Sequence, residues 1–479
     1  MVYNFFCVIL QHHYLKNVNA MNTRTLFKFL IVGMLLLLAI PESKGQHRIT
    51  EAMFSDKIQK TIVREYNYPA TVTYVETTDT HYFVYADESM QIACTPIDNT
   101  IHVLDFVIHD KKVYFCGFQN GNTTQGIWGW FDVSGLMIAP LTYHTYDGFN
   151  CQSQQVDTIH SLAVHEEQGE FHIAMVGANT DGVATRRWCL IDVWGTPGST
   201  TGWHYEMGVP FGVNCPYDRM THVCVTDNYI VVAGNYVNPN NSETYRIHQR
   251  NNVFSSSYED SIYAFPLHNT GYIHDSVNFA MTPVYGDLVA VANKAYGFQS
   301  GYQNKILVNV YDMALTLATP AASPVYTMCT SVNIFSTGYS IRGMRYSANH
   351  SVLHLLLSGD SLPNTFSPGS IIAELPVPPT GIGSYTTLDD RILLSLDNYH
   401  SQGNTLAVGF DYSDASKLNY FTQPLQSASQ CGLQNVIRYI DNGYSAKTTP
   451  SPYTTCTKTF KCKSRQIGST TKGNDPVCP

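Results

Sequence analysis

Tryptophan is the first residue type in this sequence whose placement suggests ligand chemistry. All five tryptophans lie between residues 128 and 203, and their flat rings could stack on sugar rings. Two recur at one spacing, four residues before an aspartate: Trp128 before Asp132 and Trp188 before Asp192. This recurrence favours a repeated core position for that pair, so Trp194 and Trp203, which fall outside it, are the better ligand-binding candidates.

A long polar segment offers a second group of candidates. Residues 235–261 read NYVNPNNSETYRIHQRNNVFSSSYEDS, and we expect a loop without regular structure, which is usually either functional or disordered. Aromatic rings and hydrogen-bond donors suit a polar ligand such as a glycan, and plain disorder is the alternative. The candidate residues of this segment are Tyr236, Tyr245, Arg246, His248 and Arg250.

Acidic and histidine side chains recur at equivalent spacings, but they predict no catalytic centre. Equivalent positions of separate repeats lie at least a sheet apart, whereas the two carboxylates of a glycosidase lie about 5 to 10 Å apart. We therefore interpret Asp132, Asp192 and Asp312 as structural, and His109 and His165 as turn residues rather than metal ligands. The sequence has no GxSxG, HExxH or Walker motif. We predict no catalytic residue, no metal site and no cofactor.

A repeat of about 58 residues must position these side chains. Pairs of short apolar strands with a turn between them recur, as β-hairpins require, at residues 104–117, 161–177, 222–234, 279–292, 343–359 and 393–409. Each pair ends in a small residue: Gly117, Gly177, Gly234, Ala292, Gly359 and Gly409. A third strand follows most pairs and carries Asp132, Asp192, Asp312 or Glu374.

Cysteine placement follows the same rhythm. Four of the twelve cysteines precede the first strand of a repeat: Cys94, Cys151, Cys215 and Cys329. We interpret these positions as structural, and the cysteines as core thiols or as members of a few disulfides. Eleven cysteines lie beyond residue 45, an odd number, so at least one is expected to stay unpaired or to bond between chains.

This pattern is typical of a β-propeller, in which each repeat forms one blade. A β-helix has shorter coils, and stacked sandwich domains need about 100 residues each. Residues 65–440 resemble β-propellers of the kelch and WD40 kind and, more loosely, uncharacterised secreted propellers of Gram-negative bacteria. The resemblance implies an all-β propeller over residues 65–442, with residues 46–64 as a lead-in and 443–479 as a tail rich in Ser, Thr and Lys.

We expect seven blades, of which six are complete, and six blades is the alternative. The seventh would be a composite that joins strands from residues 70–94 to a strand that follows Cys431, because closing the ring removes exposed sheet edges. Ligands would bind the face that carries the loops between second and third strands and between blades. Five residues are expected to open these loops, as ligand-binding groups or as Asx-turns: Asn179, Asn235, Asn293, Asp360 and Asp411.

The N-terminal residues 1–45 predict export. Arg24 and Lys28 precede the apolar run 29–40, and small residues follow near Gly45, as in a cleaved signal peptide. The true start is then Met21, and a membrane anchor is the alternative, although twelve apolar residues are short for a bilayer span. We expect the protein in the periplasm, at the cell surface or outside the cell.

Composition narrows the possible partners. Charged residues make up 14% of the chain, and the formal net charge is −9, which argues against nucleic acid as a partner. A non-catalytic protein that recognises a glycan or a protein partner is therefore the leading hypothesis. A propeller hydrolase or lyase acting on polysaccharide is the first alternative, and a structural component of a cell-surface assembly is the second.

Overall fold

The computed structural model divides the chain into two units, residues 1–46 and 47–479. It describes the strands, the helix and the short turns given below between residues 48 and 461, and not residues 1–47, 462–479 or the longer connections. No described helix has the length and apolar character needed to cross a membrane.

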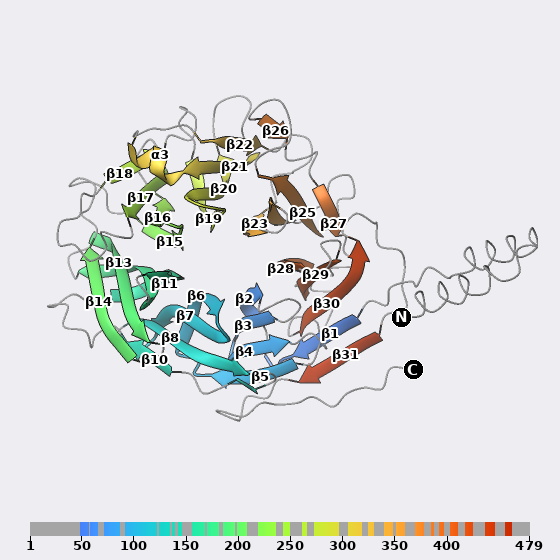
Figure 1. Cartoon of the computed structure of the whole chain (residues 1–479). Coiled ribbons are helices and arrows are strands. Elements are labelled where there is room, and N and C mark those ends of the chain that lie inside the picture. Colours follow the sequence, from blue (N-terminus) through green and yellow to red (C-terminus); the bar gives the residue numbers. More distant parts are fainter. Residues whose placement is uncertain are drawn as a thin grey trace, which may run out of the picture. The chain divides into compact units, whose positions relative to one another are not determined.

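The described strands of residues 47–479 form seven sheets, which we number along the chain (Figure 1). The first contains β2 (Ile58–Glu65), β3 (Thr71–Thr77), β4 (His81–Ala86) and β5 (Ile92–Ile97). The second contains β6 (Ile101–His109), β7 (Lys112–Gln119), β8 (Gln125–Ser134), β9 (Met137–Ile138) and β10 (Thr142–Thr145). The third contains β11 (Val156–Glu167), β12 (Glu170–Asp181), β13 (Thr185–Thr196) and β14 (Ser199–Met207).

The remaining four sheets follow the same plan, with a strand added at some edges. The fourth contains β15 (Arg219–Val225), β16 (Tyr229–Asn235), β17 (Glu243–Gln249) and β18 (Ser261–Phe265). The fifth contains β19 (Ile273–Pro283), β20 (Leu288–Tyr296), β21 (Lys305–Asp312), β22 (Tyr326–Cys329) and β26 (Tyr385–Thr387), with helix α3 (Met313–Ala318) after β21. The sixth contains β23 (Ser340–Ser347), β24 (Val352–Gly359), β25 (Gly369–Pro376) and β27 (Ile392–Leu396). The seventh contains β28 (Gly403–Phe410), β29 (Lys417–Pro424), β30 (Val436–Ser445), β1 (Arg48–Met53) and β31 (Cys456–Lys461).

The first strands of the sheets form a closed inner ring. They contact one another in the order β2, β6, β11, β15, β19, β23 and β28, and β28 contacts β2. Figure 1 shows the sheets arranged around a central opening, with these strands nearest to it. Successive sheets packed face to face around one axis are a β-propeller, so the predicted all-β propeller fold is confirmed.

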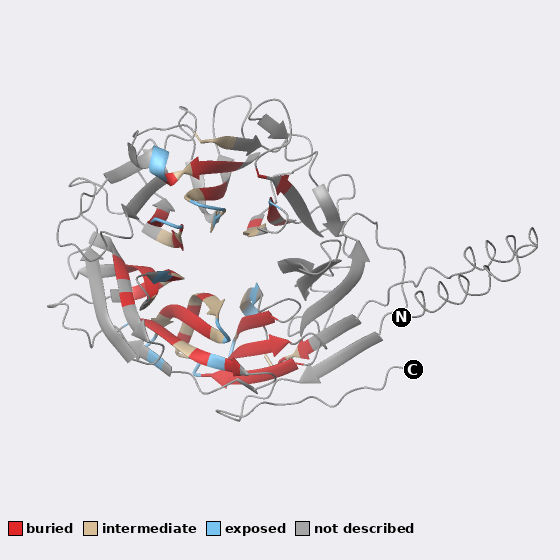
Figure 2. Ribbon diagram, viewed as in Figure 1, coloured by how far each residue is buried: buried red, intermediate tan, exposed pale blue. Residues whose placement is uncertain are grey.

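The hydrophobic core lies between successive sheets, because strands with described side chains, such as β4, bury them on both faces. In β4, Tyr82, Val84 and Ala86 pack toward the seventh sheet with Ala52 of β1, whereas Phe83 and Tyr85 pack against the second sheet. This is the two-residue alternation of a β-strand. Similar clusters join the second sheet to the third, the third to the fourth, the fourth to the fifth and the fifth to the sixth. Figure 2 shows the buried residues concentrated in these strands.

Five of the six predicted hairpins are confirmed, and the sixth is wrong. The pairs β6/β7, β11/β12, β15/β16, β19/β20 and β23/β24 are antiparallel within one sheet. Over residues 393–409, however, β27 pairs with β25 of the sixth sheet, and β28 pairs with β29 of the seventh. Two consecutive apolar strands have the same sequence pattern whether they pair with each other or with other strands. Which strands pair depends on contacts between residues far apart in the sequence.

The third strand of the repeat is confirmed in four sheets. Residues Asp132, Asp192, Asp312 and Glu374 lie in β8, β13, β21 and β25. Each of these strands pairs antiparallel with the second strand of its sheet.

The closing sheet differs from the predicted composite. The strands that begin within residues 70–94 join the first sheet instead: β3 pairs with β2, β4 with β3 and β5 with β4. In the closing sheet, β30 pairs with β1, Arg48 opposite Asp441. The predicted lead-in, residues 46–64, therefore contains β1 and β2. In the predicted tail, β31 pairs in parallel with β1. The short sequence RITEAM of β1 carries two charges in six residues, which conceals its strand character.

Two of the four cysteines proposed as repeat markers lie in described strands. Cys94 lies in β5 and Cys329 in β22, each the fourth strand of its sheet in chain order, and Cys94 is disulfide-bonded. Cys151 and Cys215 lie outside the described residues. Among the described cysteines, Cys116 and Cys224 are free and buried.

A bulge at one repeated position explains the small residue that ends three of the hairpins. Gly117 pairs with Val103, Gly177 with Ile159 and Gly234 with Met220, and in each case the register of the inner strand then shifts by one residue. A Cβ atom on Gly117 would stand 1.9 Å from the carbonyl oxygen of His102. Only glycine allows the bulged inner strand to approach this closely.

Candidate functional site at the junction of the first and second sheets

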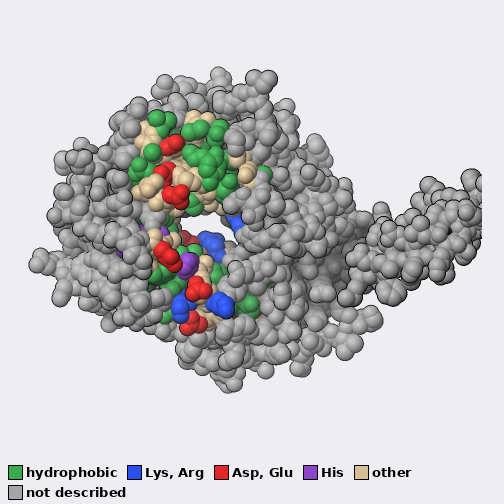
Figure 3. Space-filling model, viewed as in Figure 1, with side chains coloured by type: hydrophobic (Ala, Val, Ile, Leu, Met, Phe, Trp, Pro, Cys, Tyr) green, Lys and Arg blue, Asp and Glu red, His purple; other side chains and the backbone are tan. Residues whose placement is uncertain are grey.

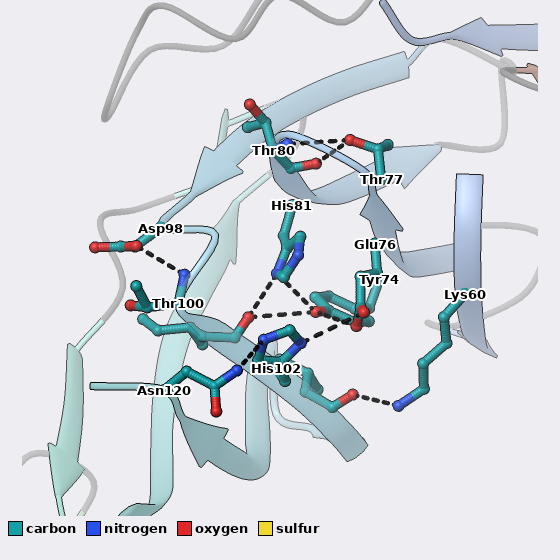
Figure 4. Close-up of polar contacts among 12 residues, drawn as sticks. Lys60, Tyr74, Glu76, Thr77, Thr80, His81, Asp98, Thr100, His102 and Asn120 are labelled. Carbon is teal, nitrogen blue, oxygen red and sulfur yellow. Dashed lines mark hydrogen bonds and ion pairs between the residues drawn. The ribbon is translucent and has the colours of Figure 1, made fainter. Parts of the chain in front are cut away.

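Five polar side chains of the first two sheets converge at one end of these sheets (Figure 4). We call them the junction cluster: Tyr74, Glu76, His81, His102 and Asn120. They flank the turn between β3 and β4, the connection between β5 and β6, and the end of β7. Because strands alternate in direction, this is the face that carries the loops between second and third strands and between sheets. We call it the loop face.

Two short turns set the histidines in place. In the turn before His81, the amide of Thr80 donates to Oγ1 of Thr77 at 3.1 Å. In the connection before His102, the amide of Thr100 donates to Oδ1 of Asp98 at 2.8 Å, an Asx-turn. Each turn starts a strand within two residues of a histidine, so the hydrogen bonds of the turns fix the backbone position of His81 and of His102.

Hydrogen bonds join the cluster into one network. Nδ1 of His81 lies 2.7 Å from the carbonyl oxygen of Ile101 and 3.1 Å from the hydroxyl of Tyr74, which also donates to Oε2 of Glu76 at 3.2 Å. Nδ1 of His102 lies 3.4 Å from Oε1 of Glu76. Nε2 of His102 lies 2.9 Å from the amide nitrogen of Asn120. The carboxylate thus connects the tyrosine of one sheet to the histidine of the next.

Aromatic contacts restrain both imidazoles. The ring of His102 stacks on Phe118, with centroids 4.7 Å apart and planes 15° apart. The rings of His81 and His102 meet edge to face at 4.9 Å. Restrained side chains of this kind lose little conformational entropy when they bind a ligand.

Burial sets the protonation states of His81 and Tyr74. Desolvation lowers the pKa of His81, with partial compensation by the Ile101 carbonyl. Desolvation and the nearby Glu76 raise the pKa of Tyr74. At neutral pH, His81 is therefore a neutral imidazole and Tyr74 a hydrogen-bond donor. The side chains of His102 and Glu76 keep 20% and 15% of their surface exposed, so the loop face gives access to them.

The cluster holds the donor set of a metal site. One ligand atom from each of Glu76, His81 and His102 lies within 4.8 Å of the other two. The sequence predicted no metal site, whereas the structure brings together three residues that could hold a metal ion. The sequence concealed it because residues 70–94 were assigned to the closing blade and His102 precedes the first recognised hairpin. The available signal was a histidine following a short turn with Asp and Thr, in TTDTH and DNTIH.

The residues predicted to bind ligand from the sequence lie elsewhere, in the third to fifth sheets where described. Eight are strand residues: Asn179 in β12, Trp194 in β13, Trp203 in β14, Asn235 in β16, Tyr245, Arg246 and His248 in β17, and Asn293 in β20. Tyr236, Arg250, Asp360 and Asp411 lie outside the described residues. The two tryptophans lie on paired strands, Trp194 opposite Gly202 and Trp203 opposite Val193.

Three of the predicted loops contain strand residues. Residues 235–261 contain β17, which pairs with β16 and β18. Its sequence ETYRIHQ alternates in the two-residue period of a strand, but the surrounding polar residues hid this signal. Asn179 and Asn293 do not open loops either, because β12 continues to Asp181 and β20 to Tyr296. Asn235 is the last residue of β16.

A second polar network crosses the inner ring. Asp105 of β6 accepts a hydrogen bond from Nη2 of Arg64 on β2 at 2.7 Å and from the hydroxyl of Ser161 on β11 at 2.8 Å. The amide of Val223 on β15 donates to the Ser161 hydroxyl at 3.5 Å. Figure 3 shows charged and histidine side chains around the central opening. The first four sheets are therefore linked near the axis by polar contacts.

His222 adjoins this network and makes stability depend on pH. Burial lowers its pKa to about 4, so below pH 6.5 the unfolded chain binds a proton that the folded chain does not accept until about pH 4. The contribution of His222 to stability is then constant above pH 6.5 and falls by up to about 3 kcal/mol toward pH 4. We expect His222→Gln to reduce this loss, measured by urea unfolding at pH 7, 6 and 5. Parallel curves for the two proteins would contradict it.

Comparisons with known proteins add little beyond these observations. No family model matches the chain, and no curated protein matches it. Among solved structures it is similar to a protein from Lactobacillus plantarum, at 12% identity over 76% of this chain and 89% of that one, with a TM-score of 0.44. It is also similar to the WD40 domain of SCAP from fission yeast, at 9% identity over 82% and 97%, with a TM-score of 0.41. An α-L-arabinofuranosidase from Fusarium graminearum matches at 10% identity over 70% and 99%, with a TM-score of 0.40. None of these similarities assigns an activity or a ligand to the chain.

Proposed function

We propose that this chain is an exported recognition protein that binds a glycan or a protein partner at the loop face of its propeller. The junction cluster forms part of the binding surface. Its role is binding rather than turnover, and the proposal does not depend on the candidate residues of the third to fifth sheets.

The observation that supports the proposal most is the convergence of polar side chains from two sheets on the loop face. Glu76 and His102 are partly exposed, and Asn120 is exposed. Together they offer a carboxylate, an imidazole and an amide, the groups that hydrogen-bond sugar hydroxyls and peptide amides. Neighbouring side chains hold them in place, since the buried Tyr74 fixes Glu76 and Phe118 stacks on His102. Preorganised polar groups at a partly open junction are typical of a binding site.

A glycan-array and pull-down screen with the purified full-length chain tests the proposal. For a ligand that binds, we expect Asn120→Ala and His102→Ala to weaken affinity at least tenfold with little change in melting temperature. His109→Ala is the matched control, because His109 also lies within 3.9 Å of a glutamate, Glu166, but in the hairpin at the opposite face. Equal affinity of all variants would place the binding site elsewhere, and release of reducing ends from polysaccharide would establish a hydrolase or lyase instead.

A further inference from the structure

The junction cluster combines two imidazoles and one carboxylate around a common point. Imidazole nitrogens suit zinc, copper and nickel, whereas magnesium and calcium prefer sites built of oxygen atoms alone. Three protein ligands with a fourth position left to water or a bound molecule are the arrangement of catalytic zinc sites, whereas structural sites use four protein ligands. The donor set therefore points to one class of ion before any distance is considered.

One distance already agrees with such a site, and the three ligand atoms lie within 4.8 Å of one another, so the side chains would draw together around an ion. Zinc bonds to nitrogen and oxygen of about 2.0–2.1 Å place two ligand atoms of a tetrahedron about 3.4 Å apart. Oε1 of Glu76 and Nδ1 of His102 are separated by 3.4 Å. The two residues come from different sheets, so no local turn explains their approach.

Surrounding groups match the outer contacts that metal ligands require. A metal-bound histidine usually donates its other ring N–H to an oxygen. Nε2 of His102 has the side-chain amide of Asn120 at 2.9 Å, and this amide carries an oxygen acceptor as well as its nitrogen. Nδ1 of His81 lies 2.7 Å from the carbonyl oxygen of Ile101. With its other ring nitrogen as the ligand atom, His81 would keep this N–H donated to that carbonyl, which is the outer contact that a histidine ligand makes.

We propose that Glu76, His81 and His102 bind a divalent transition-metal ion, zinc by preference, with one coordination position open to the loop face. This inference deepens the proposed function, because the open position would bind an oxygen of the ligand. It names a site in the first two sheets where the sequence predicted none. Partial exposure of Glu76 and His102 gives the ion a path from solvent.

Metal binding is tested with the ion alone. Chelator-treated full-length protein is titrated with zinc chloride by calorimetry and with cobalt chloride by visible absorption, which reports coordination geometry. We expect one site of micromolar or tighter affinity with tetrahedral cobalt bands, and no binding of magnesium at the same concentration. A protein that binds neither zinc nor cobalt would overturn the inference.

Variants assign the site against the background of eighteen histidines. Glu76→Gln and His102→Ala are expected to weaken zinc binding at least 100-fold and to abolish the cobalt bands, whereas His109→Ala at the opposite face leaves both unchanged. Asn120→Ala keeps all three ligands, so it should fold normally and weaken affinity about tenfold or more. Unchanged cobalt bands in Glu76→Gln and His102→Ala would overturn the assignment.

The recognition function and the metal site can be tested separately. If chelated protein keeps its affinity for a glycan or protein ligand, the proposed function stands and the link to the metal is lost. If zinc binds but the ligand screen yields nothing, the metal site stands and the recognition function is lost.

Discussion

Gly117→Ala is expected to lower the free energy of unfolding by about 3 kcal/mol, at the upper end of the cost of overpacking. The added Cβ would lie 1.9 Å from the carbonyl oxygen of His102 and 3.0 Å from Cα of Val103. Backbone atoms cannot rotate away as a flexible side chain can, so β6 must move. Because His102 belongs to β6, the same substitution should weaken zinc binding. Urea unfolding and zinc titration measure the two effects.

Gly343→Ala provides the matched control. Gly343 also lies in an inner strand, β23, but a Cβ atom there meets nothing within 4 Å. Alanine should leave stability within about 1 kcal/mol of the parent, since it mainly restricts the unfolded chain. If the two alanine variants lose equal stability, close backbone approach is not the reason for glycine at position 117.

Asp105→Ala is expected to cost about 2–3 kcal/mol of folding free energy, because one carboxylate serves partners from two other sheets. Besides Arg64 and Ser161, it accepts the backbone amides of Phe106 at 2.9 Å and Leu162 at 3.4 Å. Removing it leaves these donors near the axis without their acceptor, and unsatisfied buried groups are costly. The side chain of Arg64 is 45% exposed and can turn to water, which limits the loss. Thermal or urea unfolding measures the change.

Asp132→Ala is the control for Asp105→Ala. Asp132 also forms an ion pair, with Lys112, but its side chain is 54% exposed. Exposed pairs contribute about 0–1 kcal/mol, so this variant should unfold close to the parent. An Asp105→Ala protein as stable as the Asp132→Ala protein would show that the inner polar network does not hold the first sheets together.

The residues of the inner polar network occupy equivalent positions of the predicted repeat. Asp105, Ser161 and His222 each follow the bulge of their hairpin. The repeat thus places one side chain of the second, third and fourth sheets at an equivalent position near the axis: a carboxylate, a hydroxyl and an imidazole. Repetition supplies the geometry, and differences between repeats supply the chemistry.

Local signals in the sequence were sufficient for the fold class. Alternating apolar residues predicted the five hairpins, and the repeated small residue predicted a shared backbone position, which the bulge opposite Gly117 explains. Both signals depend on residues close together in the sequence, so they can be recognised without knowing how the rest of the chain folds. The junction cluster gave no comparable signal, because Glu76 and His102 belong to different sheets and their approach is not a contact between neighbouring residues.

Tertiary structure alone decided which strands close the ring and which polar groups meet. The pairing of β1 with β30 joins residues almost 400 positions apart, Arg48 and Asp441, and alternation cannot choose between equally apolar partners. The sequence predicted that Tyr245, Arg246 and His248 lie in a loop, but they lie in β17. Strands can be recognised from the alternation of neighbouring residues, whereas the approach of Glu76 to His102 depends on how two whole sheets pack. That packing energy is spread over many side chains between the sheets, and no single residue carries it.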